Sequence, residues 1–320
     1  MHTHSCISNT GILVITSPAQ SHPSTEIIWQ TLNSLELISG LENAPITVVA
    51  DGCRRVSSLE PEYAGRLAAR LDAHPCRFSK RGIVTDAVAE AYEEYKERLA
   101  HEVASSLPGR AVDLLELEYG GFAMAVKAGL QSVIASGAKY ALVVQHDRAF
   151  CHSLAHSDLE GIYDHLEKQP GCRYVGFPSG TSKLLAAKTS TVYQLHKLLA
   201  SRTRQLRPSI RLVPCIHWLD SNHIVDAQRA LEMYQPYSHA PARLMRRLGG
   251  AGLNRFRLRH GDFIEERFGV EQRNLLASTR DEPDECLELF DWFGSYMLMH
   301  SLPTSLSHAL SSSIGSDRTC

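Results

Sequence analysis

The chain contains the stretch Tyr140-Ala-Leu-Val-Val-Gln-His-Asp147, in which four apolar residues lead directly into a polar tripeptide that ends in a carboxylate. A short, uninterrupted apolar run is typical of a strand that is buried on both faces of a sheet. Gln145, His146 and Asp147 would then lie at the carboxyl end of this strand, the edge at which open α/β sheets bind ligands. A surface turn after a core strand would have the same sequence, so the surrounding residues have to distinguish the two.

Strands and helices alternate on both sides of this stretch. Short apolar segments predict strands at residues 12–16, 46–50, 112–117, 141–144 and 173–177. Helical spacing of apolar residues predicts helices at 24–38, 85–104, 121–136 and 158–168, two of them ended by Gly40 and Gly137. This alternation predicts an α/β fold with a mostly parallel sheet and helices on both faces.

The pattern is less regular in other parts of the chain. Residues 53–82 are expected to be irregular, and the Ser-rich residues 301–320 to form a flexible tail. After residue 180 we expect one further strand at 210–213 and helices at 189–201, 220–234 and 284–300. No internal repeat is present in the sequence.

The composition limits the classes of function. The 320 residues include 33 basic and 35 acidic ones, so a net charge of −2 gives no electrostatic signal for nucleic acid. No apolar run approaches the roughly 20 residues that span a bilayer, and the N-terminus lacks the pattern of a signal peptide. We therefore expect a cytoplasmic protein without a transmembrane segment; the alternative is a Golgi or secretory domain that is separated from its anchor. The eight cysteines form no C-x-x-C pair and are expected to be reduced thiols.

The ends of the predicted strands form a set. The first strand ends in Thr16-Ser17-Pro18 and the second in Val48-Val-Ala-Asp51-Gly52. A third segment runs from Gly121 through a helix and a Gly-containing turn into Gln145-His146-Asp147. Together these segments resemble the GT-A-type glycosyltransferases (family-2-like), which use nucleotide sugars. These enzymes carry a D-x-D motif at the end of the segment that corresponds to the third one. P-loop and dinucleotide-binding motifs are absent from the sequence.

The resemblance covers about residues 11–180 and implies a GT-A-like, Rossmann-related sheet. Residues 1–180 would bind the nucleotide sugar, and residues 181–300 would form the acceptor-binding and catalytic portion of the same domain. The resemblance further implies donor contacts from Thr16, Ser17, Asp51, Gln145 and His146, and a Mn²⁺ or Mg²⁺ ion bound by Asp147. Gln145 replaces the first Asp of the motif, so the site has one carboxylate fewer and should hold its ion less tightly. The ion would neutralise charge on the departing diphosphate.

Two downstream segments supply further candidates. Asp220, in His217-Trp-Leu-Asp-Ser-Asn-His223, is a candidate general base that would take the proton of the acceptor hydroxyl; alternatively it caps a helix. His260, before Gly261 and Asp262, is a candidate metal ligand by the resemblance, or else a loop histidine before a helix. The alternative bases are Asp262, Glu265 and Glu266. Arg residues between 243 and 259, with Lys127 and Lys183, are candidates for diphosphate contacts, although a solvated basic surface explains most of them.

These observations predict an enzyme that moves a hexosyl or related glycosyl group from a nucleoside diphosphate sugar to a hydroxyl of a glycan or other acceptor. The transfer is expected to depend on the metal ion and to invert the anomeric configuration. Two alternatives remain. One is an enzyme of the sugar nucleotidyltransferase kind on the same sheet. The other is an inactive protein that binds nucleotide sugars, which the missing first carboxylate of the motif would suit.

Overall fold

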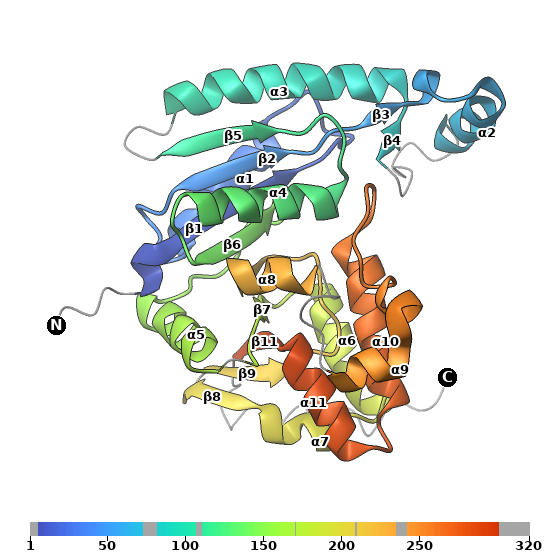
Figure 1. The fold of residues 1–320 in the computed structure, drawn as a ribbon. Coiled ribbons are helices and arrows are strands. Elements are labelled where there is room, and N and C mark those ends of the chain that lie inside the picture. The colour runs from blue at the N-terminus through green and yellow to red at the C-terminus, as the bar shows by residue number, and fades with distance from the viewer. Residues whose placement is uncertain are drawn as a thin grey trace, which may run out of the picture.

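A nine-stranded sheet runs through the protein in a computed structural model that describes residues 6–72, 82–106, 111–169, 171–208, 210–234 and 242–300. Its order is β5-β2-β1-β6-β10-β7-β11-β9-β8 (Figure 1). The strands are β1 (Thr10–Thr16), β2 (Ile46–Ala50), β5 (Val112–Glu116), β6 (Tyr140–Gln145), β7 (Tyr174–Gly176), β8 (Arg204–Arg207), β9 (Ile210–Pro214), β10 (His223–Asp226) and β11 (Ser295–His300). A separate two-stranded sheet pairs β3 (Arg54–Arg55) with β4 (Ile83–Val84).

The α/β fold is confirmed, and parallel pairing dominates one half of the sheet. β5, β2, β1 and β6 are parallel to one another, and every residue of β1 and β2 is buried. The other half is mixed, because β10 is antiparallel to both β6 and β7, and β9 is antiparallel to β11 and β8. Only two residues separate β8 from β9, and a connection that short permits only antiparallel pairing.

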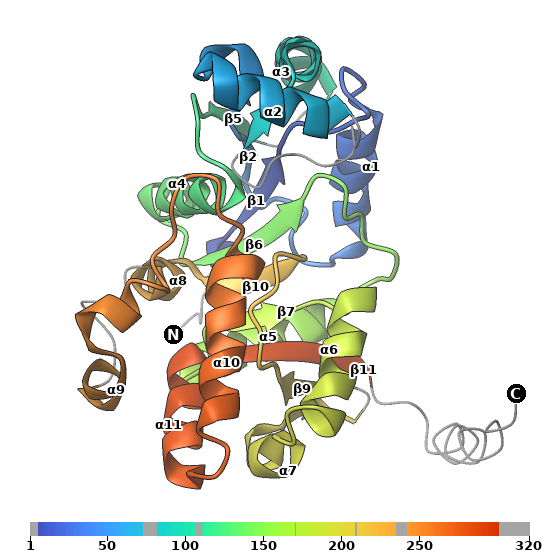
Figure 2. The ribbon, with the colours of Figure 1, turned by 90° about the vertical axis from the view of Figure 1, so that its right-hand side faces the viewer.

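Helices cover both faces of the parallel half. Figure 2 shows α4 (Phe122–Ala135) and α8 (Ala227–Met233) on one side of the sheet and α1 (Glu26–Ser34) on the other. α4 lies very close to β1, since a Cβ at Gly129 would overlap the side chain of Leu13. α3 (Asp86–Ser106) buries Tyr92, Tyr95 and Leu99 against the sheet. This tight packing fixes the carboxyl ends of β1, β2 and β6 relative to one another.

α2 (Pro61–Asp72) packs against β4 and the 3-10 turn η3 (Val56–Ser58) beside the parallel half, and the remaining helices surround the mixed half or lie at its edges (Figure 1). These remaining helices are α5 (His156–Lys168), α6 (Gly180–Thr191), α7 (His196–Leu199), α9 (Ala242–Leu253), α10 (Val270–Ser278) and α11 (Pro283–Phe293). Other short 3-10 turns are η1 (Cys6–Asn9), η2 (Leu35–Leu37) and η4 (Ala200–Arg202), and η6 (Glu265–Gly269) is a π-helical turn. The buried rings of Phe256 and Phe268 pack on Phe293 of α11, with centroid distances of 5.8 and 5.7 Å.

Several predicted elements are wrong. Residues 53–82 contain α2, and the helix expected at 189–201 is replaced by the end of α6, α7 and η4. The helix expected at 220–234 is a strand, β10, followed by α8, whose N-cap is Asp226. The segment 284–300 holds α11 and then β11, separated by Gly294 in the left-handed conformation. Short apolar strands such as β10 cannot be distinguished from helix turns by periodicity alone.

Four other predictions concern the tail, the cysteines, membrane segments and the division of the chain at residue 180. The predicted tail, residues 301–320, lies outside the described residues. Cys53, Cys151, Cys172, Cys215 and Cys286 are free thiols. Across the described ranges, no helix has both the length and the apolar character that crossing a membrane requires. The division at residue 180 does not separate two sheets, since strands from both sides of it share the nine-stranded sheet.

Candidate functional site

Two cavities meet at the carboxyl edge of the parallel half. From β1 the sheet continues to β2 in one direction and to β6 in the other, so the strand order reverses at this point. Crevices at such a reversal are the usual ligand sites of open α/β sheets. The first cavity has a volume of about 640 Å³ and the second about 290 Å³. Gln145 and Phe263 line both cavities, so the two adjoin at these side chains.

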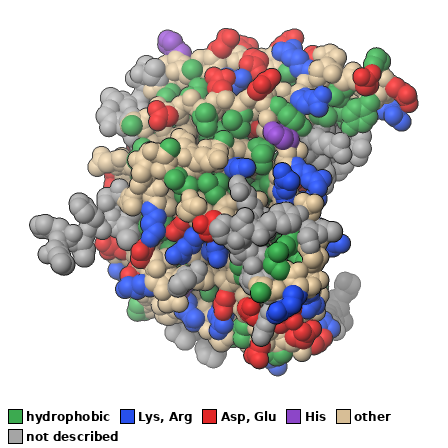
Figure 3. All heavy atoms as spheres, in the orientation of Figure 1, with side chains coloured by type: hydrophobic (Ala, Val, Ile, Leu, Met, Phe, Trp, Pro, Cys, Tyr) green, Lys and Arg blue, Asp and Glu red, His purple; other side chains and the backbone are tan. Residues whose placement is uncertain are grey.

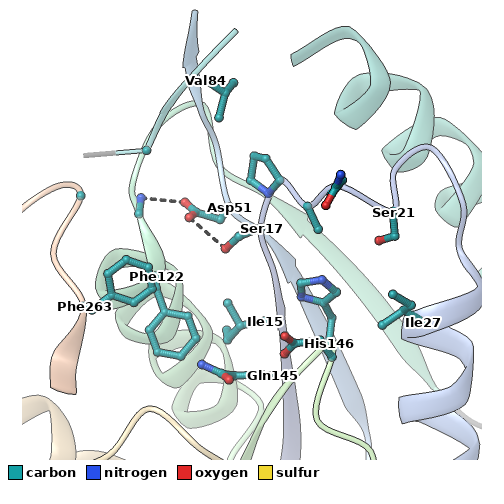
Figure 4. Close-up of a pocket in the computed structure, with 17 residues that line it drawn as sticks. Ile15, Ser17, Ser21, Ile27, Asp51, Val84, Phe122, Gln145, His146 and Phe263 are labelled. Carbon is teal, nitrogen blue, oxygen red and sulfur yellow. Dashed lines mark hydrogen bonds between the residues drawn. The ribbon is translucent and has the colours of Figure 1, made fainter. Parts of the chain in front are cut away.

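Asp51, a predicted donor contact, lines the first cavity. Its carboxylate accepts hydrogen bonds from the backbone N–H of Gly121 at 2.7 Å and from the hydroxyl of Ser17 at 3.2 Å (Figure 4). The side chain is 4% exposed, and this burial raises its pKa to about 7. The carboxyl group of Asp51 is therefore partly protonated near neutral pH, and it can donate as well as accept a hydrogen bond. The structure brings Ser17 and Asp51 together as expected.

Thr16 lies beneath the cavity and does not line it. Its hydroxyl shares a hydrogen bond with the hydroxyl of Tyr95 at 3.0 Å, and its carbonyl oxygen accepts one from Tyr92 at 3.0 Å. The side chain is fully buried against α3. The lining of the cavity starts one residue later, at Ser17.

The loop after β1 is held by a histidine that the sequence does not single out. Nδ1 of His22 accepts a hydrogen bond from the backbone N–H of Ala19 at 3.0 Å. The ring stacks on Tyr95 and Tyr92 at centroid distances of 4.0 and 5.1 Å. Burial lowers the pKa of His22 to about 3, so the ring stays neutral and Nδ1 stays an acceptor. His22 thereby fixes Ala19 and its neighbours, which form one wall of the first cavity.

Gln145, His146 and Asp147 face the same cavity, together with Ser17 and Asp51. β6 ends at Gln145, and a turn follows that is closed by a hydrogen bond from the N–H of Arg148 to the carbonyl of Gln145 at 3.0 Å. The hydroxyl of Thr31 donates to the carbonyl of His146 at 2.6 Å. Burial lowers the pKa of His146. The side chain of Asp147 is 54% exposed, so its carboxylate is open to an ion or ligand.

Asp220 lies in the wall of the second cavity. It does not start a helix of its own, because it lies in the segment between β9 and β10. Instead its carboxylate accepts the backbone N–H of Glu265 at 3.0 Å, at the first residue of η6. The side chain is 7% exposed, and burial raises its pKa well above the usual range. Glu265, Glu266 and Arg148 line the same cavity, and burial also raises the pKa of Glu265.

A loop from the C-terminal part of the chain completes the first cavity. The N–H of Gly261 donates to the carbonyl of Gly120 at 2.8 Å, and the N–H of Ala123 donates to the carbonyl of Asp262 at 3.1 Å. Gly121 has a φ of +78°, and a Cβ there would lie 2.6 Å from the Cα of Gly261. This contact places Phe263 against Phe122, with ring centroids 5.9 Å apart.

The other predicted residues lie outside both cavities. His260 is exposed and stacks on Tyr119 at 5.5 Å, and Lys127 projects from α4; neither is in either lining. The carboxylate of Asp262 accepts the N–H of Arg259 at 2.8 Å. Arg246, Arg255, Arg257 and Arg259 are exposed. On the face drawn in Figure 3, Lys and Arg side chains are interspersed with Asp and Glu. The side chains of Arg243 and Lys183 lie outside the described part.

The donor atoms available to a metal ion at the first cavity are few. Asp147 supplies a carboxylate and Gln145 an amide oxygen. Within the ranges that the structure describes, no group of three or more His, Cys, Asp or Glu side chains could hold a metal ion. A metal at this edge would therefore need oxygen ligands from the substrate as well.

Comparisons with known proteins give limited information. No protein-family model matches the chain, and no curated protein matches it. Among the solved structures that match in part is S. aureus TarS 1–349, with a TM-score of 0.26 and 13% sequence identity over 53% of this chain. Mouse xyloside xylosyltransferase 1 in its apo form has a TM-score of 0.37 and 10% identity, over 86% of this chain and 82% of that one. The 4-diphosphocytidyl-2C-methyl-D-erythritol synthase of Anaerococcus prevotii DSM 20548 has a TM-score of 0.30 and 8% identity, over 88% of this chain and 100% of that one. The match spans 35% of the TarS chain. These TM-scores are too low to assign an activity, which has to be inferred from the residues.

Proposed function

We propose that this protein transfers a glycosyl group from a nucleoside diphosphate sugar to a hydroxyl of an acceptor, with inversion. The observation that carries the proposal is the pair of cavities that share Gln145 and Phe263 at the reversal of strand order. A group transfer between two substrates needs two sites that meet where the bond is exchanged. The first cavity, about 640 Å³, is in the range of small-molecule and cofactor sites, and the second would receive the acceptor.

The polarity of the first cavity favours one orientation of the donor. Ser17 and the buried Asp51 would bind hydroxyl or N–H groups of the nucleoside, and Pro18 and Val84 beside them offer apolar surface for the base. At the other end, Gln145 and Asp147 would face the diphosphate. The sugar would then lie near Gln145, next to the second cavity.

The residues present fit a single divalent ion held jointly with the substrate. Mg²⁺ is commonly bound by one or two carboxylates together with substrate phosphates, and Asp147 supplies one such carboxylate. When bound, the ion would neutralise the charge that develops on the departing diphosphate. Because His260 stacks on Tyr119 outside the cavity lining, it is not part of the proposed site.

Asp220 is the proposed base, at the wall of the acceptor cavity. The oxygen of the acceptor hydroxyl would form a bond to the anomeric carbon while the bond from that carbon to the diphosphate oxygen breaks. The proton of the hydroxyl would pass to the carboxylate. Since burial favours the protonated form of Asp220, the base must ionise once substrates are bound. Glu265 lines the same cavity, is less buried, and is the second candidate for this role.

The experiment is a thermal-shift screen of UDP, GDP, CDP, ADP and TDP, each with and without Mn²⁺. A ligand that binds only the folded state raises the melting temperature, so at least one diphosphate should do so and Mn²⁺ should increase the shift. Asp147→Asn should remove the Mn²⁺-dependent part, whereas Asp281→Asn, at a side chain that is 90% exposed, should not. Absence of any shift would contradict the proposal. Release of pyrophosphate from a nucleoside triphosphate and a sugar phosphate would favour the nucleotidyltransferase alternative instead.

A further inference from the structure

Asn222 connects the two cavities although its side chain lines neither of them. It directly follows the segment Leu219–Ser221, which forms a wall of the second cavity, and it precedes β10. Its carbonyl oxygen accepts the backbone N–H of Phe177 at 2.9 Å, which anchors it after β7. The residue is 7% exposed. A polar side chain buried to this degree is expected to satisfy specific partners.

The side-chain amide of Asn222 spans the turn that carries Asp147. Its Oδ1 accepts the backbone N–H of Gln145 at 3.3 Å, at the start of the turn. Its Nδ2 donates to the carbonyl of Arg148 at 2.6 Å, at the end of the turn. One side chain therefore holds both ends of the segment Gln145–Arg148.

Only an amide of this length can make both contacts. An aspartate has the same shape and accepts from Gln145, but when ionised it has no proton to donate to the carbonyl of Arg148. An alanine makes neither contact. The turn therefore depends on an asparagine at position 222, and a buried side chain of another kind would not hold it in the same geometry.

The turn presents side chains to both cavities. His146 and Asp147 face the first, Arg148 faces the second, and Gln145 faces both. We infer that Asn222 is a positioning residue, which fixes the proposed metal-binding carboxylate of Asp147 relative to the acceptor wall that contains Asp220. The link to catalysis rests on the proposed function, but the holding of the turn does not. Partners that orient metal ligands typically contribute about 10–100-fold in affinity or activity.

The test compares Asn222→Asp and Asn222→Ala with Asn274→Asp, the same chemical change at an exposed residue of α10. Binding by calorimetry is measured for the nucleoside diphosphate that gives the largest shift in the screen, and for the matching nucleoside, with and without Mn²⁺. We expect both Asn222 variants to lose about 10–100-fold of the Mn²⁺-dependent gain in diphosphate affinity. The affinity for the nucleoside should not change, because Ser17 and Asp51 are held by β1, β2 and α4.

If the Asn222 variants lost equal affinity for the nucleoside and for the diphosphate, Asn222 would have a general structural role and the inference would be overturned. The inference would also be overturned if Mn²⁺ increased the diphosphate affinity of the variants as much as that of the wild-type protein. Amide hydrogen exchange of the Gln145–Arg148 segment is measured in parallel, and it does not require any ligand. Exchange should be faster in both Asn222 variants than in the wild-type protein and in Asn274→Asp. If the wild-type protein binds no nucleotide, the proposed function fails, and this exchange result alone decides whether Asn222 holds the turn.

Discussion

The contact between Gly121 and Gly261 supports a quantitative prediction. We expect Gly121→Ala to destabilise the protein by more than Gly137→Ala, although both glycines have a positive φ, of +78° and +86°. A positive φ costs an alanine about 1–2 kcal/mol at Gly137, and about 1–3 kcal/mol at Gly121, whose ψ of 161° lies in a region open almost only to glycine. The loss of chain entropy in the unfolded state is also the same for both substitutions. Gly137→Ala therefore controls for the chain entropy and for the cost of a positive φ, and the main remaining difference is in the surroundings of the new methyl group.

The surroundings differ sharply. At Gly137 a Cβ would meet nothing within 4 Å, whereas at Gly121 it would lie 2.6 Å from both the Cα and the N of Gly261. These are backbone atoms and cannot rotate away, so the loop has to separate from α4. Two backbone hydrogen bonds, Gly261 to Gly120 and Ala123 to Asp262, would be lost. At about 1 kcal/mol each, with about 1 kcal/mol for the Phe122–Phe263 stack, the additional destabilisation is about 3 kcal/mol.

Urea unfolding followed by circular dichroism measures this difference. Gly121→Ala should lower the free energy of unfolding by about 4–6 kcal/mol in total, and Gly137→Ala by about 1–2 kcal/mol. Gly121→Ala should also weaken nucleoside diphosphate binding, because Phe263 leaves the cavity wall, whereas Gly137→Ala should bind normally. If the two variants had equal stabilities, the loop would not depend on this contact and the reasoning would be refuted.

Asp220→Asn should reduce glycosyl transfer by about 10²–10⁴-fold, the usual contribution of a general base, while the urea midpoint changes little because an amide oxygen can still accept the N–H of Glu265. If Glu265→Gln instead shows the larger loss in a transfer assay, Glu265 is the base. The buried histidines should make the protein less stable in acid. Burial lowers the pKa of His165, His217 and His223 to about 4, so the stability from burying them neutral is complete above pH 6.5 and is lost as the pH falls towards 4. Asp51 acts in the opposite sense, because its raised pKa favours folding at low pH and this contribution is lost as the pH rises from 3.8 to about 7. The difference in urea midpoint between the wild-type protein and Asp51→Asn isolates the Asp51 contribution, and that between the wild-type protein and His223→Gln isolates one histidine contribution; a difference that is independent of pH between about pH 4 and 8 would contradict the corresponding prediction.

The sequence predicts the edge at which the site lies, because parallel strands place their carboxyl ends together. Ser17, Asp51 and Asp147 follow three buried strands, and the structure brings all three into one cavity. Thr16 could not be separated from Ser17 by sequence, since which of two neighbouring hydroxyls faces the cavity depends on Tyr95 and the packing of α3.

The parts that could not be predicted depend on contacts between distant segments. Phe263 enters the cavity because Gly261 can approach Gly121 closely, and nothing local to residue 263 indicates this. Asn222 could not be identified because the sequence predicts a helix over residues 220–234. β10, which follows Asn222, has only four residues and gives too short a pattern to be recognised as a strand. For Asp220, the capping interaction expected within its own helix is made instead with η6, which is 45 residues away in the sequence.

The position of β11 has a consequence for synthesis on the ribosome. β11, the last strand in the part of the chain that the structure describes, lies between β7 and β9 and pairs with both. The parallel strands β1, β2, β5 and β6 can associate as soon as residue 145 has emerged, in keeping with N-terminal units folding first during translation. Until residues 295–300 emerge, β7 and β9 lack their common neighbour and expose unpaired strand edges, which favour association with other chains. A nascent chain or a truncation that ends before Ser295 should therefore need chaperone protection even though its parallel half is already folded.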